Sequence, residues 1–520
     1  MSEGALDRIR RIAADAGLDP AHPPEVMAEA QALAKAPGID DPRLLDLRRL
    51  PFCTIDEATS KDLDQALFVE ESKAGWTVWY AIADAAWFAR PGTALFAEAL
   101  RRGATYYLPG LVIPMLPKIL SEDVVSLGPD VDRRAMVFEV GIARDGEVLG
   151  TKFHRAVVRS RLKTSYDAVQ AWFDGAALSG GDAAIEASLR AFRGVGEARL
   201  DRADAHHVVI IRRREIEVGL ADSGFRFVAI ADARNDVERW NEQISLLCNE
   251  EGAKLLREGD RPDDAVQAVY RVHGIPEIER LDALADTVAR IVERRGLDPA
   301  VWGWRLGTRK ASDWLAGLPE DGPEGRLALA LHRQVVLAMN SASFTAEPGA
   351  HMGIGADVYA RFTAPMREIV GVYVHKEAWE RLGVETPTPN ADDDRLREQV
   401  IEVSNAAKAT QRALDGKINR LVLDQILADD LASAAPPERM GTVMGIARGA
   451  VHVLLDDPPV DVKVYLEHLQ GPIKRTADRL AVVREDGGAV VCEVGDAVKV
   501  RVRGVDKERD RIALDLRRSP

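Results

Sequence analysis

Cysteines are scarce in this sequence, with three in 520 residues, at positions 53, 248 and 492. A disulfide framework or a C-x-x-C metal site needs cysteines at short spacing, so neither is expected, and buried thiols are the plainer interpretation. Long apolar runs are also missing, whereas a membrane helix needs about 20 consecutive apolar residues. The segment Met1 to Gly4 lacks the basic and apolar regions of a signal peptide. We therefore expect a cytoplasmic protein with no membrane partner.

Positive charge is in deficit as well, because 69 Lys and Arg residues face 83 Asp and Glu residues, which gives a formal net charge of −14. A protein that coats nucleic acid with its whole surface is disfavoured, since phosphate binding draws on Lys and Arg. Any nucleic-acid contact should be confined to local basic tracts. Such tracts are present from Arg155 to Lys163, from Arg212 to Arg214 and from Lys499 to Arg503.

The remaining composition, with 46% apolar and 29% charged residues, is typical of a folded protein of two or three domains. Helical spacing on both sides of a proline-rich break predicts a small helical domain over residues 1–48, which could be a helix-turn-helix or a helical cap on a larger domain. Strand-like runs to about residue 165, then helical stretches with a last helix at about 390–430, predict a mixed domain over residues 49–436. The expected fold class is α+β.

A proline pair separates this domain from residues 437–520, whose short strand-like runs and turn signals predict a small antiparallel barrel. Its closing pattern, from Val494 to Leu514, resembles the S1-type OB fold found in many RNA-binding proteins. In the run Val498 to Arg503, alternation puts Lys499 and Arg501 on one face of a strand and the valines on the other. We expect Lys499 and Arg501 to contact RNA, although a solvated strand face, or a barrel that binds oligosaccharide or protein, would show the same pattern.

Three aspartates crowd into nine residues, at positions 56, 62 and 64. In an extended segment Asp62 and Asp64 point the same way, because they are two positions apart. Crowded carboxylates repel and need a compensating cation, and hard oxygen ligands favour magnesium or manganese over zinc. A magnesium ion held there can activate water and stabilise the leaving oxygen in phosphodiester hydrolysis. An acidic surface loop that caps a helix is the plainer alternative.

Further short motifs follow the aspartate segment Thr54–Leu67 in a fixed order. They are Ala81–Asp84, Arg90–Leu95, Arg102–Gly110, Val112–Pro117, Leu120–Asp123, Glu347–Gly355, Tyr359–Arg367 and His375–Lys376. Together they resemble the catalytic domain of the ribonuclease II family, the RNB domain, which is commonly followed by an S1-type barrel. The resemblance implies a processive 3′→5′ exoribonuclease that hydrolyses single-stranded RNA to nucleoside 5′-monophosphates. It also implies Mg²⁺ as the cofactor, with Mn²⁺ as a substitute, and a monomeric protein.

For catalysis, the resemblance assigns Asp56, Asp62 and Asp64 to the metal cluster, with Asp64 nearest to the reaction. Arg367 matches the arginine that holds the scissile phosphate, where a guanidinium can make paired bonds to phosphate oxygens and neutralise developing charge. A structural salt bridge is the alternative role for Arg367. Gln65 stands where the family usually has a fourth aspartate. We therefore expect Gln65 to offer the metal a neutral oxygen and the affinity for Mg²⁺ to be weaker.

For the RNA strand, the resemblance points first to aromatic side chains. Tyr107 matches the ring that stacks on the 3′-terminal base, and stacking tolerates any base. Phe227 is the candidate for the opposite side of this clamp, with Phe225 as a rival and a core phenylalanine as the plain alternative. Gln411 stands where the family has a glutamate on a later helix, and we expect it among the RNA-binding residues.

Other departures from the family pattern bear on activity. Glu368 to Gly371 replace the Arg-Tyr-Ala-Asp run that commonly follows the phosphate-binding arginine, so catalysis could be slower or prefer manganese. Only about 48 residues precede the matched motifs, in place of the family's two cold-shock barrels, and we expect a differently built entrance that could admit partly structured RNA. Gln65 and Gln411 also suggest a non-catalytic RNA-binding regulatory protein that keeps the fold. A metal nuclease or phosphatase acting on DNA is a third alternative.

Overall fold

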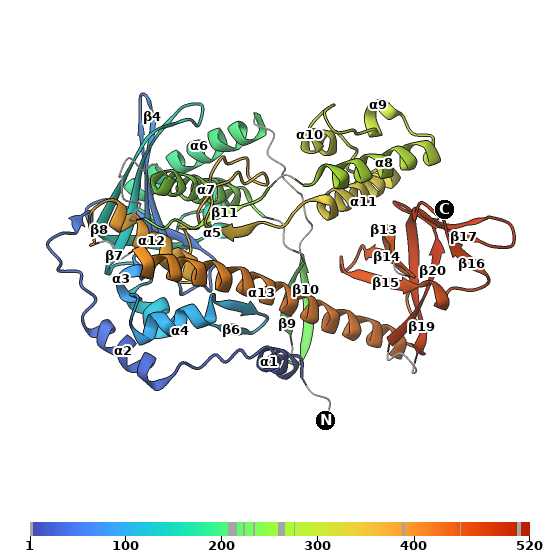
Figure 1. Cartoon of the computed structure of the whole chain (residues 1–520), viewed down its shortest axis with the longest axis horizontal. Coiled ribbons are helices and arrows are strands. Elements are labelled where there is room, and N and C mark those ends of the chain that lie inside the picture. The colour runs from blue at the N-terminus through green and yellow to red at the C-terminus, as the bar shows by residue number, and fades with distance from the viewer. Residues whose placement is uncertain are drawn as a thin grey trace.

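The computed structural model describes residues 4–519 except 206–215, 222–223, 232–233, 258–265, 275, 387–389, 448 and 507–510. Helices and strands are both abundant, which confirms the α+β class (Figure 1). Within the described ranges, no helix combines the length and apolarity needed to cross a membrane. The basic tract Arg212 to Arg214 lies outside the described residues.

Strands from the first third of the chain form the central sheet. They are β1 (Leu45–Asp46), β2 (Phe52–Asp56), β3 (Gln65–Ser72), β4 (Gly75–Ala83), β7 (Asp132–Ala143) and β8 (Val148–Ser165). The strand order is β1-β8-β2-β3-β4-β7, and β7 also pairs with β8, so the strands from β8 to β7 close into a ring. β8 allows this closure because its first part runs antiparallel to β7 and its last residues run parallel to β2. Since β2 and β3 are antiparallel neighbours, the segment between Asp56 and Gln65 lies at one end of the ring.

The sheet buries both of its faces, as the two-residue period of a strand allows. Along β4, Val78, Tyr80 and Ile82 enter one hydrophobic core, whereas Ala81 and Ala83 enter another. The helices of the first core are α5 (Tyr166–Phe173), α6 (Ala183–Ala205), α7 (Asp236–Arg257) and α12 (Ile369–Arg381). Those of the second core include α3 (Ala85–Phe88) and α4 (Ala94–Arg102). Helices therefore contribute to the hydrophobic cores on both sides of the sheet.

A further group of helices forms a layer at the upper right of Figure 1, and its core also includes Met444, Leu480 and Val494 of the C-terminal region. It consists of α8 (Ile278–Arg295), α9 (Pro299–Trp302), α10 (Ala311–Ala316) and α11 (Gly322–Ala338). Trp304 and Trp314 stack at its centre, with their ring centroids 6.0 Å apart. The layer reaches the C-terminal strands through the contact of α11 with β13 (Arg439–Ala447).

One long helix, α13 (Asn390–Ala432), crosses the molecule and ends beside the C-terminal strands (Figure 1). It confirms the helix expected at about 390–430. Its contacts include α12, α4, α1 (Ala5–Asp15) and a strand from each of three short hairpins. These hairpins are β5 (Tyr106–Leu108) with β6 (Leu111–Ile113), β9 (Ile216–Ala221) with β10 (Arg226–Ala231), and β11 (Tyr270–Val272) with β12 (Ser343–Thr345). α13 thus brings distant parts of the chain together along one axis.

The C-terminal strands form two sheets that pack around one core, to which Leu423 and Leu427 of α13 also belong. One has the order β15-β14-β13-β19-β20 and the other β16-β17-β18. The strands not yet introduced are β14 (Ala450–Leu455), β15 (Asp461–Tyr465), β16 (Ile473–Arg475), β17 (Ala481–Arg484), β18 (Val490–Glu493), β19 (Ala497–Asp506) and β20 (Arg511–Arg518). In β19 Val498, Val500 and Val502 are buried while Lys499 and Arg501 point outward, which confirms the alternation. The S1-type assignment of residues 437–520 stays a prediction.

Two helices form in the first 48 residues, as expected, but they pack on different parts of the molecule. α1 lies against α13, β6 and β10, whereas α2 (Pro24–Lys35) lies against α4. Ile9 of α1 and Val26 of α2 accordingly belong to separate hydrophobic cores. This arrangement favours helical caps over a helix-turn-helix. The domain boundary at residue 48 stays a prediction.

Candidate active site

The aspartate segment runs from the end of β2, at Asp56, through the loop of residues 57–64 into β3, so the interpretation as an acidic cap of a helix is wrong. Polar side chains hold its backbone. The Lys163 ammonium donates to the carbonyls of Ala58 and Ser60, both at 2.8 Å. The Ser126 hydroxyl donates to the carbonyl of Lys61 at 2.7 Å and accepts from the N–H of Leu63 at 3.0 Å. These bonds satisfy backbone groups that strand pairing leaves free, and they fix the path of the loop.

Asp64 and Arg367, 303 positions apart in the chain, form an ion pair at the centre of the site. Arg367 Nε donates to Asp64 Oδ2 at 2.5 Å, and the N–H of Met366 donates to Asp64 Oδ1 at 3.1 Å. The Asp64 side chain is 1% exposed, whereas that of Arg367 is 35% exposed. The guanidinium therefore reaches from a buried carboxylate toward solvent, where a ligand can meet it.

Asp62, Tyr107 and Gln411 form a second connected group. The Tyr107 hydroxyl donates to Asp62 Oδ2 at 2.5 Å. Gln411, on α13, donates from Nε2 to the carbonyl of Tyr107 at 3.2 Å and to Asp415 Oδ1 at 2.8 Å. Tyr107 is 44% exposed although its hydroxyl is engaged, so the ring keeps a free face for a base. The structure thus brings together three residues that the sequence assigned to metal and RNA.

The charges of the site act on one another. Burial raises the pKa of Asp64 to about 6, against the attraction of Arg367, and the nearby charge of Asp62 raises it further. Burial lowers the pKa of Arg367, but Asp64, Tyr107, Asp56 and Asp62 outweigh burial and hold that pKa above its usual range. The charges of all three aspartates therefore act on one guanidinium, and Asp64 is the one bonded to it.

The donor chemistry fits a hard divalent cation, because carboxylate oxygens repel one another here and a cation would relieve the repulsion. The carboxylate oxygens of Asp56, Asp62 and Asp64 do not lie in one close group, however. Among the described residues, two groups bring their ligand atoms within 4.8 Å of one another, and neither includes Asp56, Asp62 or Asp64. In this conformation Arg367 and Tyr107 bond to the oxygens that a metal would take. Metal binding by these aspartates stays a prediction.

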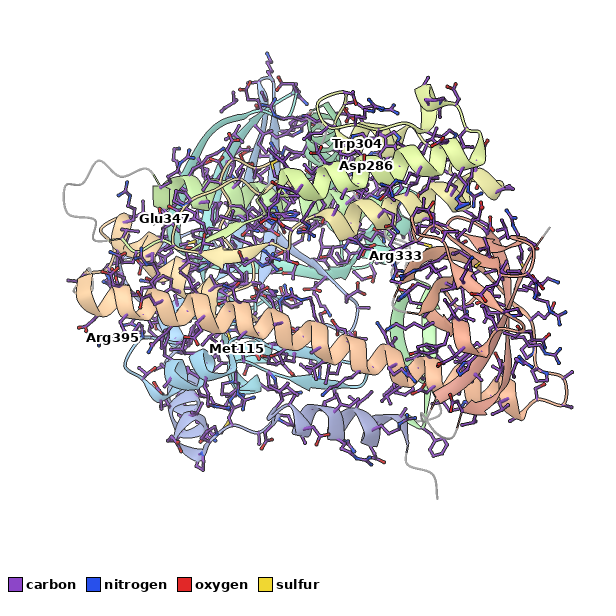
Figure 2. All side chains as sticks on the ribbon, turned by 45° about the vertical axis from the view of Figure 1, so that its right-hand side comes forward. Met115, Asp286, Trp304, Arg333, Glu347 and Arg395 are labelled. Carbon is purple, nitrogen blue, oxygen red and sulfur yellow. The ribbon has the colours of Figure 1, made fainter. Side chains whose placement is uncertain are left out.

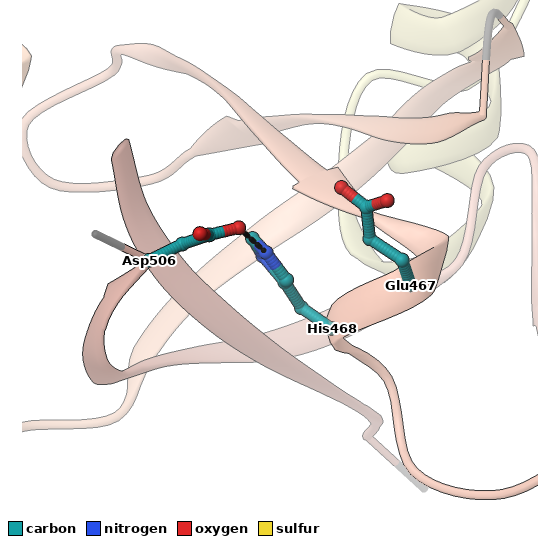
Figure 3. A group of neighbouring side chains, drawn as sticks. All are labelled: Glu467, His468 and Asp506. Atoms are coloured by element: carbon teal, nitrogen blue, oxygen red, sulfur yellow. Dashed lines mark hydrogen bonds and ion pairs between the residues drawn. The ribbon is translucent and has the colours of Figure 1, made fainter. Parts of the chain in front are cut away.

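Those two groups lie elsewhere in the chain. One consists of Glu467 and His468, in the short 3-10 helix Leu466–His468, and Asp506 at the end of β19, where His468 Nε2 lies 3.2 Å from Asp506 Oδ2 (Figure 3). The other consists of the buried side chains of Glu377, Glu380 and Asp393. Lys376 Nζ bonds to all three of the latter, at 2.6, 2.8 and 2.7 Å respectively, and so supplies the cation itself.

Gln65 is held at both ends of its amide. Its Nε2 donates to the carbonyl of Thr363, and its Oε1 accepts from the buried Tyr80 hydroxyl at 2.5 Å. Tyr80 in turn lies 2.9 Å from the Ser245 hydroxyl. Gln65 therefore ties the aspartate loop to the segment that carries Arg367. Its predicted role as a metal ligand stays untested, and its oxygen already has one partner.

The remaining predicted RNA-binding residues lie away from this ion pair. Phe227 is 4% exposed and packs with α1 and α13 residues, and its N–H donates to Gln425 Oε1 at 3.0 Å. This burial favours the core interpretation for Phe227 over the clamp. Phe225 is exposed, beside the start of α1, where its carbonyl accepts from the N–H of Ala5. Lys499 and Arg501 lie on β19 in the C-terminal sheet.

Sequence reasoning missed Tyr166, whose ring is close enough to Asp56 for their charges to interact. Burial raises the pKa of Tyr166 and the negative charge of Asp56 raises it further. The Tyr166 hydroxyl accepts from Asn241 Nδ2 at 3.0 Å. Asp56 is paired with Ser165 across β2 and β8, which puts Tyr166 next to it. Only this strand pairing reveals the neighbourhood, since the two residues are far apart in sequence.

The family model for the RNB domain matches residues 44–382. The chain belongs to the RNB family. It is 26% identical over 489 residues to ribonuclease R of Escherichia coli, covering 91% of this chain and 57% of that relative, so the chain spans a little over half the relative's length.

Solved structures share the fold. A Mycoplasma genitalium RNase R in complex with ribose-methylated single-stranded RNA superposes with a TM-score of 0.88 at 21% identity, over 99% of this chain and 78% of that one. Yeast Ssd1, described as a pseudonuclease, superposes with a TM-score of 0.65 at 12% identity, over 90% of this chain and 54% of its own. The RNB fold is therefore shared by proteins described as nucleases and by one described as a pseudonuclease.

Proposed function

We propose that this protein is a 3′→5′ exoribonuclease that hydrolyses single-stranded RNA processively to nucleoside 5′-monophosphates, with Mg²⁺ or Mn²⁺ held by Asp56, Asp62 and Asp64. The observation that carries the proposal is the pair of Asp64 with a partly exposed Arg367, surrounded by two further aspartates and an exposed tyrosine. RNB relatives named ribonuclease R, and an RNase R structure in complex with single-stranded RNA, support the choice of substrate.

In the proposed mechanism, Arg367 binds the non-bridging oxygens of the terminal phosphodiester and neutralises the charge that develops on them. Asp64 orients the guanidinium through the bond at Nε. Tyr107 presents its ring to the last base, while Gln411 holds the Tyr107 backbone. A metal ion bound by the aspartates would supply Lewis acidity and lower the pKa of the attacking water.

The C-terminal strands are the proposed S1-type domain and the outer part of the RNA path. Lys499 and Arg501 project from one face of β19, where cationic side chains can follow a phosphate backbone. One Mycoplasma genitalium RNase R structure is a complex with double-stranded RNA, which supports the proposal that partly structured RNA is accepted. A cytoplasmic location and a monomeric state stay predictions.

The direct experiment incubates the purified protein with 5′-end-labelled single-stranded RNA and Mg²⁺, with a matched DNA strand as the control. We expect a ladder that shortens from the 3′ end of the RNA and intact DNA. Retention of RNA without cutting would favour the non-catalytic alternative, which the hydrogen-bonded Gln65 and the likeness to Ssd1 support. Loss of the DNA strand would favour the third alternative, a nuclease acting on DNA.

A further inference from the structure

Beside Arg367 lies a group of cationic side chains that the proposed mechanism does not use. We call it the cation cluster, and it consists of Arg271, Arg361, Lys408 and Arg412. They come from three separate segments: β11, the segment just before Arg367, and α13. Four like charges converge in a protein whose net charge is −14, so the local surplus is not a reflection of overall composition.

One carboxylate lies within the cluster. Glu368 Oε1 is 3.2 Å from Arg361 Nη2 and 3.1 Å from Lys408 Nζ. Burial on its own would raise the pKa of Glu368. The positive charges of Arg361 and Lys408 outweigh burial and hold the pKa at about 2. Glu368 is therefore ionised at neutral pH and balances part of the charge of two cations. One carboxylate among four cationic side chains leaves the cluster with an excess of positive charge.

Arg271 and Arg412 carry that excess. In the part of the chain that the structure describes, no salt bridge joins either of them to a carboxylate. Arg271 instead lies over the ring of Phe344, with its guanidinium carbon 5.4 Å from the ring centroid. Burial, and then the neighbouring Arg361, lower the pKa of Arg271. Such a set of cations gains free energy when an anion joins it.

The cluster shares a helix face with the catalytic groups. Lys408, Gln411 and Arg412 are spaced by three and four residues on α13, so their side chains leave the helix on one side. Lys408 reaches Glu368, the neighbour of Arg367, and Gln411 reaches the backbone of Tyr107. Arg361 is also close enough to Arg367 for their charges to interact. An anion bound by the cluster would therefore lie next to the site of cleavage.

We propose that the cation cluster binds a phosphate group of the RNA strand other than the one held by Arg367. The inference rests on the proposed function for the nature of the strand. A phosphodiester chain presents an anion at every nucleotide, so a strand whose terminal linkage lies at Arg367 can place a further phosphate in the cluster. Lys408 and Arg361 are oriented by Glu368, whereas in the described part of the chain no carboxylate is paired with Arg271 or Arg412, so their charge is the part that a phosphate would balance.

The test measures the affinity of a labelled RNA of about 20 nucleotides in EDTA, over a series of salt concentrations. We expect Arg271→Gln and Arg412→Gln each to weaken binding about tenfold and to reduce the slope of log K against log salt by about 0.7, the value for one phosphate of a single strand. Arg412→Lys should restore the slope, because it restores the charge.

Arg395→Gln is the matched control, since it removes the same charge from the same helix. Arg395 lies near the N-terminal end of α13, 71% exposed and paired with Asp392 (Figure 2). It should bind RNA as the unmodified protein does. An unchanged affinity and slope in Arg412→Gln, or a lower turnover rate with unchanged affinity, would overturn the proposal.

Failure of the proposed function is separable from failure of this inference. Binding in EDTA does not depend on cleavage, so the loss of affinity in Arg412→Gln can be seen even in a protein that never cuts RNA. If the unmodified protein cuts RNA and the variants bind like it, the inference alone is wrong.

Discussion

Two regions of this molecule crowd carboxylates around a cation, and they differ in how completely the cation is used. Around Lys376, three buried carboxylates accept one bond each from the ammonium, and the lysine side chain is 11% exposed. Around Arg367, one buried carboxylate is bonded, two more act from a distance, and part of the guanidinium faces solvent. The first region is saturated and structural. In the second region part of the Arg367 guanidinium is exposed and not bonded to a carboxylate, so a ligand can bind it.

The largest expected difference between the regions is in catalysis. Asp64→Asn keeps the shape of the side chain but removes the charge that pairs with Arg367 and that would hold the metal. We expect RNA cleavage to fall by at least about a thousandfold, while RNA binding is retained. Time courses with end-labelled RNA, together with binding in EDTA, measure the two effects. Full activity in Asp64→Asn would count heavily against the assignment.

The reverse experiment removes the cation from the saturated region. Lys376→Met leaves Glu377, Glu380 and Asp393 buried without their shared partner. We expect the free energy of unfolding to fall by about 3–5 kcal/mol, because an uncompensated buried charge is costly. Denaturant titrations followed by circular dichroism measure it. Arg367→Met is the comparison, and it should cost less stability while abolishing cleavage; equal losses of stability would erase the distinction between the regions.

A smaller effect on RNA cleavage and binding is expected at Tyr107, the exposed aromatic residue of the active site. Tyr107→Ala removes the ring face that is free to stack on a base and the bond to Asp62. We expect RNA affinity to fall about tenfold and the shortest end product to change in length. Gel separation of the final products reports the length. An unchanged product ladder would remove Tyr107 from the RNA clamp.

The pH dependence of stability sharpens the comparison further. Burial raises the pKa of Glu377 to about 7, against the attraction of Lys376, and the charge of the neighbouring Asp393 raises it further. The pKa in the folded protein lies above the ordinary glutamate pKa of 4.5, so the stabilising contribution of Glu377 is complete below about pH 4.5 and is lost as the pH rises through 7. Glu377→Gln should remove this loss. The exposed Glu398→Gln, on α13, should leave the pH profile as it is, and a profile that does not respond to Glu377→Gln would contradict the account.

Local patterns predicted the parts of the structure that depend on local physics. The alternation of Lys499 and Arg501 with valines appears in β19, and the long C-terminal helix appears as α13. The aspartate segment was found because charge crowding is visible in the sequence. Resemblance, rather than spacing, selected Arg367 as its partner across 303 positions.

What the sequence could not give depends on packing between distant segments. The burial of Phe227 follows from the way β10 meets α1 and α13, and no local signal separates a core phenylalanine from a stacking one. Gln65 was expected to offer the metal a neutral oxygen, but its amide is bonded to Tyr80 and Thr363, which lie on other segments. The cation cluster was invisible for the same reason, since Arg271 and Arg412 are far apart in the chain.

The most direct test of the central claim is to locate a metal ion by anomalous scattering from crystals of the protein grown with Mn²⁺ and a non-cleavable RNA. The account predicts a manganese peak coordinated by Asp64 and its neighbours Asp56 and Asp62, beside the Arg367 guanidinium. A peak at Glu467, His468 and Asp506 alone, with none at Asp64, would contradict it.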